Sequence, residues 1–252
     1  MSVIVLNKPI GKTPLQTIEE YRLVHPELTC VKLAYAGRLD PMAEGLLLVL
    51  VGEECKKKKD YENLSKIYEF EVLFGISTDT FDVMGKITKI NPQPVKISAE
   101  EIHKVIKKYK GEILQEYPPY SSLRVNGKPL FWWARENRLD EIKIPKKRIM
   151  INELGIMSNY QITSKELLKI VHKRMEKVMG DFRQKEILQV WDKKLKDRNF
   201  RFSVLSFKII CSSGTYVRSI ANKMGEDLRI GAIALSIKRT KIGKFSILNL
   251  KS

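Results

Sequence analysis

The chain has 252 residues, of which 43% are hydrophobic and 30% charged, a composition that excludes a disordered protein and fits a soluble globular one. Lysine and arginine total 46 against 29 acidic residues, so the net charge is +17; such a chain is most simply a polyanion binder, because each neutralised phosphate releases counterions. No apolar run approaches the roughly 20 residues of a membrane-spanning helix, and the N-terminus lacks the basic segment of a secretory signal.

The first 90 residues predict short strands separated by one helix. The helix opens at Pro14, because Thr13 and Gln16 can form a capping box around a proline at the first helical position. Leu15 and Ile18 are expected to form its apolar face. Apolar runs and period-two alternation predict strands over 3–6, 46–51, 67–74 and 86–90.

The rest of the chain mixes further helices and strands. Ser98 and Glu101 form a second capping box, which predicts a helix that buries Ile102. Two amphipathic helices are expected over 164–180 and 181–196, as a hairpin inserted between strands. The later elements are expected to be a strand over 202–211, a turn and helix over 212–228, and one or two edge strands in IKRTKIGKFSILNL. This order has no regular βαβ alternation and favours an α+β fold.

Most familiar catalytic and metal-binding patterns are missing. Cys30, Cys55 and Cys211 are an odd number, lie far apart and form no CxxC pair, which argues against a disulfide framework and a zinc site and for a reducing compartment such as the cytoplasm. His103 and His172 fall on predicted solvated helix faces, which argues against a Ser-His-Asp triad. The sequence has no GxxxxGK[ST], no GxGxxG after a strand and no HExxH.

One carboxylate stands out in the segment YAGRLDPMAEGLLLVLVG. Asp40 is the only acidic residue between Cys30 and Glu44, and it precedes a proline, which biases its backbone to an extended conformation. Gly37 permits the close approach of a backbone or a ligand. Such a group can act as a nucleophile or general base, provided that a cation keeps it ionised. The alternative is that Asp40 only organises its turn.

Two other residues could complete a site. Arg218 falls in the first turn of its predicted helix, where the helix dipole disfavours a cation, so an anionic partner is expected. Tyr68 alternates with Ile67 and therefore points to the opposite face of its strand. An ordinary surface arginine and a tyrosine that packs in a sheet are the alternatives.

Five segments, in this order, resemble the motifs of the TruB family of tRNA pseudouridine synthases. They are VLNKPIGKT, AGRLDPMAEGLLLVLVGEECK, YEFEVLFGISTDTFDVMG, YSSLRVNGKPLFWWAR and CSSGTYVRSIANKMG. The resemblance covers residues 1–157 and 201–245. It implies a pseudouridine synthase fold with a mixed, mainly antiparallel central sheet flanked by helices. It also implies a single catalytic domain over 1–252, interrupted by a basic helical insertion over 158–200.

The resemblance also implies a mechanism. Asp40 would be the nucleophile or base that isomerises uridine to pseudouridine, by breaking the glycosidic bond and rejoining the sugar at C5. Arg218 would hold Asp40 ionised, Tyr68 would stack on the uracil and help to remove the C5 proton, and Ile237 would line the base pocket. No metal or organic cofactor is implied. The loop is tight because a nucleophile must be fixed against the reacting sugar carbon.

The implied substrate is the T-arm of tRNA, with uridine 55 of the T-loop as the target. A stacked base cannot be reached, so it must be flipped out at a cost of a few kcal/mol, which phosphate contacts of the basic surface offset. A monomer without an obligatory protein partner is expected. The residues expected at the substrate are Lys8, Pro9, Tyr35, Gly37, Arg38, Thr80, Asp82 and Ile237, with Lys8, Arg38, Lys56 and Lys57 as phosphate contacts.

The sequence departs from the family pattern at several positions. Tyr35 stands where many members have a histidine that takes part in base flipping, Arg38 replaces a small residue, and Ile10 replaces a glutamine. Because the sequence ends soon after KFSILNLKS, no C-terminal PUA module is expected. The segment from Ser164 to Phe200 has 11 Lys/Arg against 6 Asp/Glu, so the insertion is hypothesised to grip tRNA in place of that module. The alternative is a lineage-specific decoration.

Two other functions stay open. One is a pseudouridine synthase of another branch, which acts on ribosomal RNA or with a guide RNA, although the TDTFD and GTYVRS segments favour the tRNA branch. The other is a non-catalytic protein that binds or folds RNA and has kept the scaffold. Replacing Asp40 with asparagine separates these hypotheses, because only an enzyme would lose pseudouridine formation while it keeps RNA binding.

Overall fold

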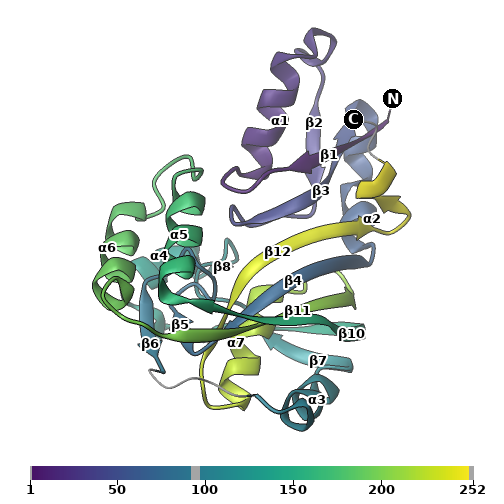
Figure 1. Cartoon of the computed structure of the whole chain (residues 1–252). Coiled ribbons are helices and arrows are strands. Elements are labelled where there is room, and N and C mark those ends of the chain that lie inside the picture. Colours follow the sequence, from purple (N-terminus) through teal and green to yellow (C-terminus); the bar gives the residue numbers. More distant parts are fainter. Residues whose placement is uncertain (1, 92–96, 250–252) are drawn as a thin grey trace.

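The computed structural model describes residues 2–91 and 97–249. Its main element is a nine-stranded sheet with the order β1-β3-β12-β4-β11-β10-β7, to which β2 is added beside β3 and β13 beside β12 (Figure 1). The strands are β1 (Val3–Lys8), β2 (Leu33–Ala36), β3 (Ala43–Val51), β4 (Lys66–Phe74), β7 (Gly111–Glu116), β10 (Lys146–Thr163), β11 (Arg201–Cys211), β12 (Ala232–Ile242) and β13 (Phe245–Ser246). All pairs are antiparallel except β3 and β12, which are parallel.

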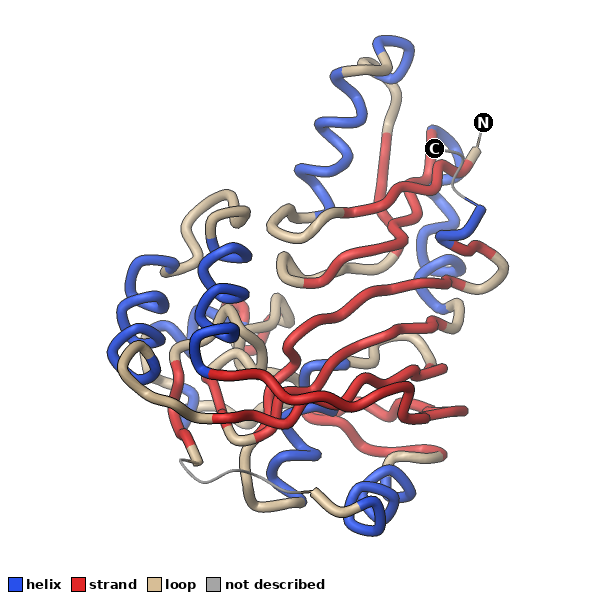
Figure 2. Tube along the Cα trace, viewed as in Figure 1, coloured by secondary structure: helices blue, strands red, loops and turns tan. Residues whose placement is uncertain are grey.

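Helices and two small ribbons surround this sheet, as Figure 2 shows. The helices are α1 (Pro14–Leu23), α2 (Lys58–Asn63), α3 (Ala99–Lys108), α4 (Leu130–Arg135), α5 (Ser164–Met175), α6 (Gln184–Leu195) and α7 (Val217–Asp227). The ribbons pair β5 (Ile76–Thr78) with β6 (Ile87–Ile90), and β8 (Arg124–Val125) with β9 (Lys128–Pro129). This arrangement confirms an α+β fold with a mixed, mainly antiparallel central sheet flanked by helices.

The two faces of the sheet carry different helices because side chains alternate along each strand. Phe70 and Phe74 of β4 pack into a core with α3 and α7, whereas Leu73 packs into a second core with α5 and α6. In Figure 1, α5 and α6 stand side by side at one end of the long strands. Burial of one such apolar side chain contributes about 1.5–3 kcal/mol, so both faces stabilise the sheet.

Local signals in the sequence located the helix starts. Both capping boxes are confirmed, since Thr13 accepts from the backbone of Gln16, and Ser98 accepts from the backbone of Glu101. Only part of the expected apolar face of α1 is buried, because Leu15 is 58% exposed. It lies in the first turn of α1, whereas Ile18, one turn further along the helix, is buried.

The last part of the chain required the largest correction. The segment from 237 to 250 was expected to form edge strands, but β12 lies in the interior of the sheet between β3 and β4. Arg239 of this strand is only 1% exposed, and its guanidinium donates to backbone carbonyls inside the protein. The inserted helical hairpin is present as α5 and α6, but residues 158–163 belong to the 18-residue strand β10, which was not expected.

No helix in the described part of the chain is both long enough and apolar enough to cross a membrane.

Candidate active site

A cleft of about 560 Å³ opens beside the loop between β2 and β3. Its lining includes Asp40 from that loop, Tyr68 from β4, Ile237 from β12 and Tyr216 from the start of α7. A larger cavity of about 810 Å³ lies between α3 and β10, but it has no carboxylate among its lining residues. The cleft at Asp40 brings that carboxylate together with Tyr68, Lys66 and Arg239.

Asp40 forms an ion pair with Arg218 at the floor of this cleft. The Nε atom of Arg218 donates to Oδ2 of Asp40 at 2.8 Å. Its Nη1 atom donates to the carbonyl of Thr80 at 2.8 Å, and its Nη2 atom donates to the carbonyl of Tyr120 at 2.9 Å. The guanidinium is therefore held by three acceptors from three segments, and one of its charge-assisted hydrogen bonds fixes the carboxylate of Asp40.

The backbone around Asp40 is fixed by a second arginine that the sequence analysis missed. Arg239 of β12 donates through Nε to the carbonyl of Leu46 (2.8 Å), through Nη1 to that of Arg38 (3.0 Å) and through Nη2 to that of Gly37 (3.3 Å). Gly37 has a φ of +86°, which favours glycine at this turn. The segment SIKRTKI also carries Lys238 and Lys241, so no local signal in the sequence distinguishes Arg239 as the buried cation.

Tyr68 and Ile237 form the apolar side of the cleft. Tyr68 pairs with Arg239, and Ile237 pairs with Phe70, so the two side chains come from neighbouring strands. Burial raises the pKa of the Tyr68 hydroxyl, so this residue is a neutral phenol near pH 7. A flat aromatic ring and an aliphatic side chain near a fixed carboxylate can accommodate a planar base.

Lys8 does not occupy the position expected of a phosphate contact. Its side chain is fully buried, and Nζ donates to the carbonyls of Lys12 (2.7 Å), Pro9 (2.8 Å) and Pro41 (3.4 Å). Burial lowers the pKa of Lys8 to about 7. The structure therefore assigns Lys8 to holding the turn after β1 against the Asp40 loop. Pro9 is exposed but is not among the residues that line the cleft.

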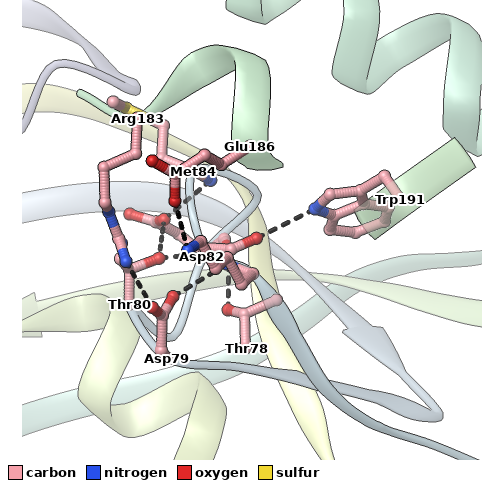
Figure 3. Close-up of polar contacts among 10 residues, drawn as sticks. Thr78, Asp79, Thr80, Asp82, Met84, Arg183, Glu186 and Trp191 are labelled. Carbon is pink, nitrogen blue, oxygen red and sulfur yellow. Dashed lines mark hydrogen bonds and ion pairs between the residues drawn. The ribbon is translucent and has the colours of Figure 1, made fainter. Parts of the chain in front are cut away.

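Thr80 and Asp82 also lie outside the cleft, in a buried loop behind Arg218. The hydroxyl of Thr80 donates to Oδ1 of Asp82 at 2.6 Å, and the backbone N–H of Met84 donates to the same oxygen at 2.9 Å (Figure 3). Burial raises the pKa of Asp82 to about 6, an effect that Arg218 partly offsets. These two residues shape the loop whose carbonyl accepts from Arg218, and they are not placed to contact a substrate.

Of the remaining expected residues, Tyr35, Gly37 and Arg38 line the cleft, whereas Lys56 and Lys57 do not. Tyr35 lines it, with Nζ of Lys58 5.3 Å from the centre of its ring. Arg38 is exposed beside it, a position that a phosphate can reach. Lys56 and Lys57 are exposed but form surface ion pairs with glutamates on their own turn, Glu53 and Glu54.

A set of buried cations surrounds Asp40. Lys8, Lys66, Arg218 and Arg239 are each at most 4% exposed. Burial lowers the pKa of Lys66 to about 8, and its Nζ donates to the carbonyls of Glu62 and Leu64. Within the described residues, no group of three or more His, Cys, Asp or Glu side chains could hold a metal ion. Asp40 and Glu62 are the acidic residues that line the cleft, together with the cations Arg38, Lys66, Lys147 and Arg239. This cationic lining around Asp40 suits a nucleophile or base that acts on an anionic polymer.

Comparisons with known proteins place the sequence in one family. Residues 25–173 match the model of the TruB family pseudouridylate synthase N-terminal domain. A protein named tRNA pseudouridine synthase B from Clostridioides difficile (strain 630) is 32% identical over 247 residues, which is 98% of this chain and 67% of that protein. The protein of that name from Caldicellulosiruptor saccharolyticus is 29% identical over 245 residues, covering 97% of this chain and 68% of the relative.

The fold has solved counterparts. A chain in the crystal structure of a Cbf5-Nop10-Gar1 complex superposes with a TM-score of 0.59 at 17% identity over 97% of this chain. A chain of an archaeal box H/ACA sRNP Nop10-Cbf5 complex gives a TM-score of 0.55 at 17% identity. This chain spans about half the length of those solved chains. The family match, which covers more than half of the sequence, shows that the chain belongs to the TruB family of pseudouridylate synthases.

Proposed function

We propose that this protein isomerises uridine to pseudouridine in the T-loop of tRNA, at position 55. Relatives named tRNA pseudouridine synthase B align along nearly the whole chain. The observation that carries the proposal is the pair of Asp40 and Arg218, in which the carboxylate faces the cleft and the guanidinium lies beneath it.

The reaction exchanges one bond to the sugar for another. Asp40 acts as the nucleophile or base while the bond from C1′ to N1 of uracil breaks, and a bond from C1′ to C5 then forms. The C5 proton leaves and N1 gains a proton, so the atoms balance without a co-reactant. Arg218 holds the carboxylate of Asp40 in place, Tyr68 stacks on the detached uracil, and Ile237 lines the base pocket.

The basic surface supplies the binding energy for base flipping. Eight cations on the hairpin of α5 and α6 are exposed and form no salt bridge with a described acidic residue. They are Lys165, Lys169, Lys173, Lys177, Lys185, Lys193, Lys196 and Arg198. We infer that this surface contacts tRNA phosphates, with the protein acting as a monomer in the cytoplasm, where its three free cysteines remain reduced.

A salt titration tests the hairpin. The double variant Lys169→Gln, Lys173→Gln should bind tRNA more weakly, and the slope of log K against log salt concentration should fall by about 0.7–0.9 for each lost contact. Lys104→Gln on α3, where the lysine is paired with Glu100, is the matched control and should leave the slope unchanged. An unchanged slope in the double variant would exclude the hairpin as a phosphate-binding surface.

The enzymatic function is tested with an unmodified tRNA transcript. Chemical sequencing should locate pseudouridine at one T-loop uridine after incubation with the protein. Asp40→Asn should form none while it binds tRNA with similar affinity, because the amide keeps the shape but loses the charge. Pseudouridine only in another class of RNA would overturn the tRNA assignment, and binding without any product in the parent protein would indicate an RNA-binding role.

A further inference from the structure

The inserted hairpin reaches the candidate active site through one aromatic residue. The hairpin loop (residues 176–183) connects α5 to α6, and its Phe182 lines the same cleft as Asp40 and Tyr68. Phe182 is half-buried, with one part packed on the apolar core of the hairpin and the rest facing the cleft. The insertion therefore supplies part of the wall of the cleft.

The hairpin loop is held in one conformation by its own hydrogen bonds. Nε2 of Gln184 donates to the carbonyl of Gly180 at 2.6 Å and to that of Val178 at 3.2 Å. Oε1 of Gln184 accepts from the backbone N–H of Phe182 at 2.9 Å. Arg183 has a φ of 63°, a left-handed conformation that is unfavourable for a residue with a side chain. This conformation changes the direction of the backbone between Phe182 and the start of α6.

The loop is also attached to the rest of the protein. The backbone N–H of Met179 donates to the carbonyl of Gly11 at 3.3 Å, and Nη2 of Arg135 donates to the carbonyl of Asp181 at 3.1 Å. Nη1 of Arg183 donates to Oδ2 of Asp79 at 2.8 Å, and Figure 3 shows this pair beside the Asp82 loop. Further along α6, Nε1 of Trp191 donates to the carbonyl of Gly85 at 2.9 Å. These contacts fix Phe182 relative to the catalytic loop.

One contact links the loop to the catalytic pair. The guanidinium of Arg183 lies 4.3 Å from the centre of the Tyr120 ring, and the carbonyl of Tyr120 accepts from Nη2 of Arg218 at 2.9 Å. Tyr120 itself lines the cleft. The hairpin loop and Arg218 therefore both contact Tyr120. This shared contact fixes the position of Phe182 relative to Asp40 in the cleft.

We propose that Phe182 is a specificity-determining residue that stacks on an unpaired nucleobase adjacent to the flipped uridine. This inference rests on the proposed function. Flipping one nucleotide leaves the neighbouring bases partly unstacked, and an aromatic ring fixed in the wall of a basic cleft offers them a replacement surface. Base–aromatic stacking accounts for about tenfold to hundredfold in affinity.

The test combines protein variants with abasic substrates. A tRNA transcript carries an abasic site at either neighbour of the target uridine. With the parent protein, one of these sites should raise KM by about tenfold to hundredfold and leave kcat within about threefold. Phe182→Ala should raise KM by the same factor on intact tRNA. Its KM should not rise further on that abasic substrate, because the protein variant and the abasic site each remove the same contact.

Matched variants distinguish stacking from loop structure. Met179→Ala removes an apolar side chain from the same loop that is 51% exposed and does not line the cleft, so KM should stay unchanged. Phe182→Trp should keep the sensitivity to the abasic site, whereas Phe182→Leu, which keeps apolar packing, should lose it. The leucine and tryptophan variants decide the question even where the alanine variant is unfolded.

Two results have separate meanings. If Phe182→Ala and Phe182→Leu keep the parent KM, or if their losses add fully to those of the abasic sites, the stacking role is wrong. If the parent protein forms no pseudouridine in intact tRNA, the proposed function itself fails.

Discussion

Arg218 and Asp40 form an ion pair in which the two partners differ in exposure. The side chain of Arg218 is 4% exposed, whereas that of Asp40 is 36% exposed, and Nε and Oδ2 lie 2.8 Å apart. No described residue donates a hydrogen bond to Oδ1 of Asp40. The guanidinium of Arg218 is therefore buried and fixed, whereas Oδ1 of Asp40 is free to contact a substrate in the cleft. A nucleophile or base requires such an accessible oxygen.

Replacing Arg218 with lysine should reduce catalysis more than substrate binding. A lysine ammonium keeps the charge but cannot donate simultaneously to Asp40 and the carbonyls of Thr80 and Tyr120. We expect kcat to fall by about 10²–10³-fold and the free energy of unfolding by about 1–3 kcal/mol. Single-turnover pseudouridine formation and urea unfolding measure these effects. A variant with kcat within threefold of the parent would show that the geometry of the guanidinium is not needed.

Replacing Arg239 with methionine should destabilise the Asp40 loop. Methionine fills a similar volume but donates no hydrogen bond, so the buried carbonyl of Leu46 and the partly buried carbonyls of Arg38 and Gly37 lose this donor. We expect the free energy of unfolding to fall by about 2–4 kcal/mol, and kcat to fall as Asp40 loses its fixed position. Urea unfolding tests this, with Arg148→Met as control, because Arg148 is 78% exposed and should change stability by less than about 0.5 kcal/mol. Equal effects in the two variants would contradict the role of Arg239.

Residue patterns that depend on near neighbours could be predicted from the sequence. The capping boxes at Thr13 and Ser98 involve residues three positions apart, and the strand periodicity of β4 is equally local. The anionic partner of Arg218 was also predictable, because a cation in the first turn of a helix is electrostatically unfavourable alone. These features need no knowledge of the tertiary structure.

Features that depend on which segments meet in space could not be predicted. Lys8 reads as a surface cation, but its ammonium is buried because carbonyls from the turn after β1 and from Pro41 converge on it. The place of β12 inside the sheet depends on parallel pairing with β3, which no local pattern encodes. Phe182 lies in the cleft only because the hairpin loop docks on Gly11 and Asp79.

Two glycines with positive φ should differ in their tolerance of alanine. Gly45 has a φ of +108°, and a Cβ there would overlap the backbone of Arg239 on the neighbouring strand. Gly52 has a φ of +59° and open space around it. We expect Gly45→Ala to lower the free energy of unfolding by about 2–4 kcal/mol and Gly52→Ala by about 1 kcal/mol. Thermal and urea unfolding measure both, and a smaller loss at Gly45 would contradict the close approach of β3 and β12.

Asp82 should make stability depend on pH in the acidic range. Burial raises its pKa from 3.8 to about 6, so between those values the folded state binds a proton more tightly than the unfolded state. The stabilisation from this proton is present at low pH and is lost as pH rises through about 6.

Asp82→Asn removes the titration and keeps an oxygen that accepts from Thr80 and from the N–H of Met84. The free energy of unfolding of the variant minus that of the parent should therefore rise by about 2–3 kcal/mol between pH 4 and pH 7, with most of the change below pH 6.5. Urea unfolding at half-unit pH intervals measures the difference. A flat or falling difference would mean that Asp82 is ionised in the folded protein throughout this range, held so by Arg218.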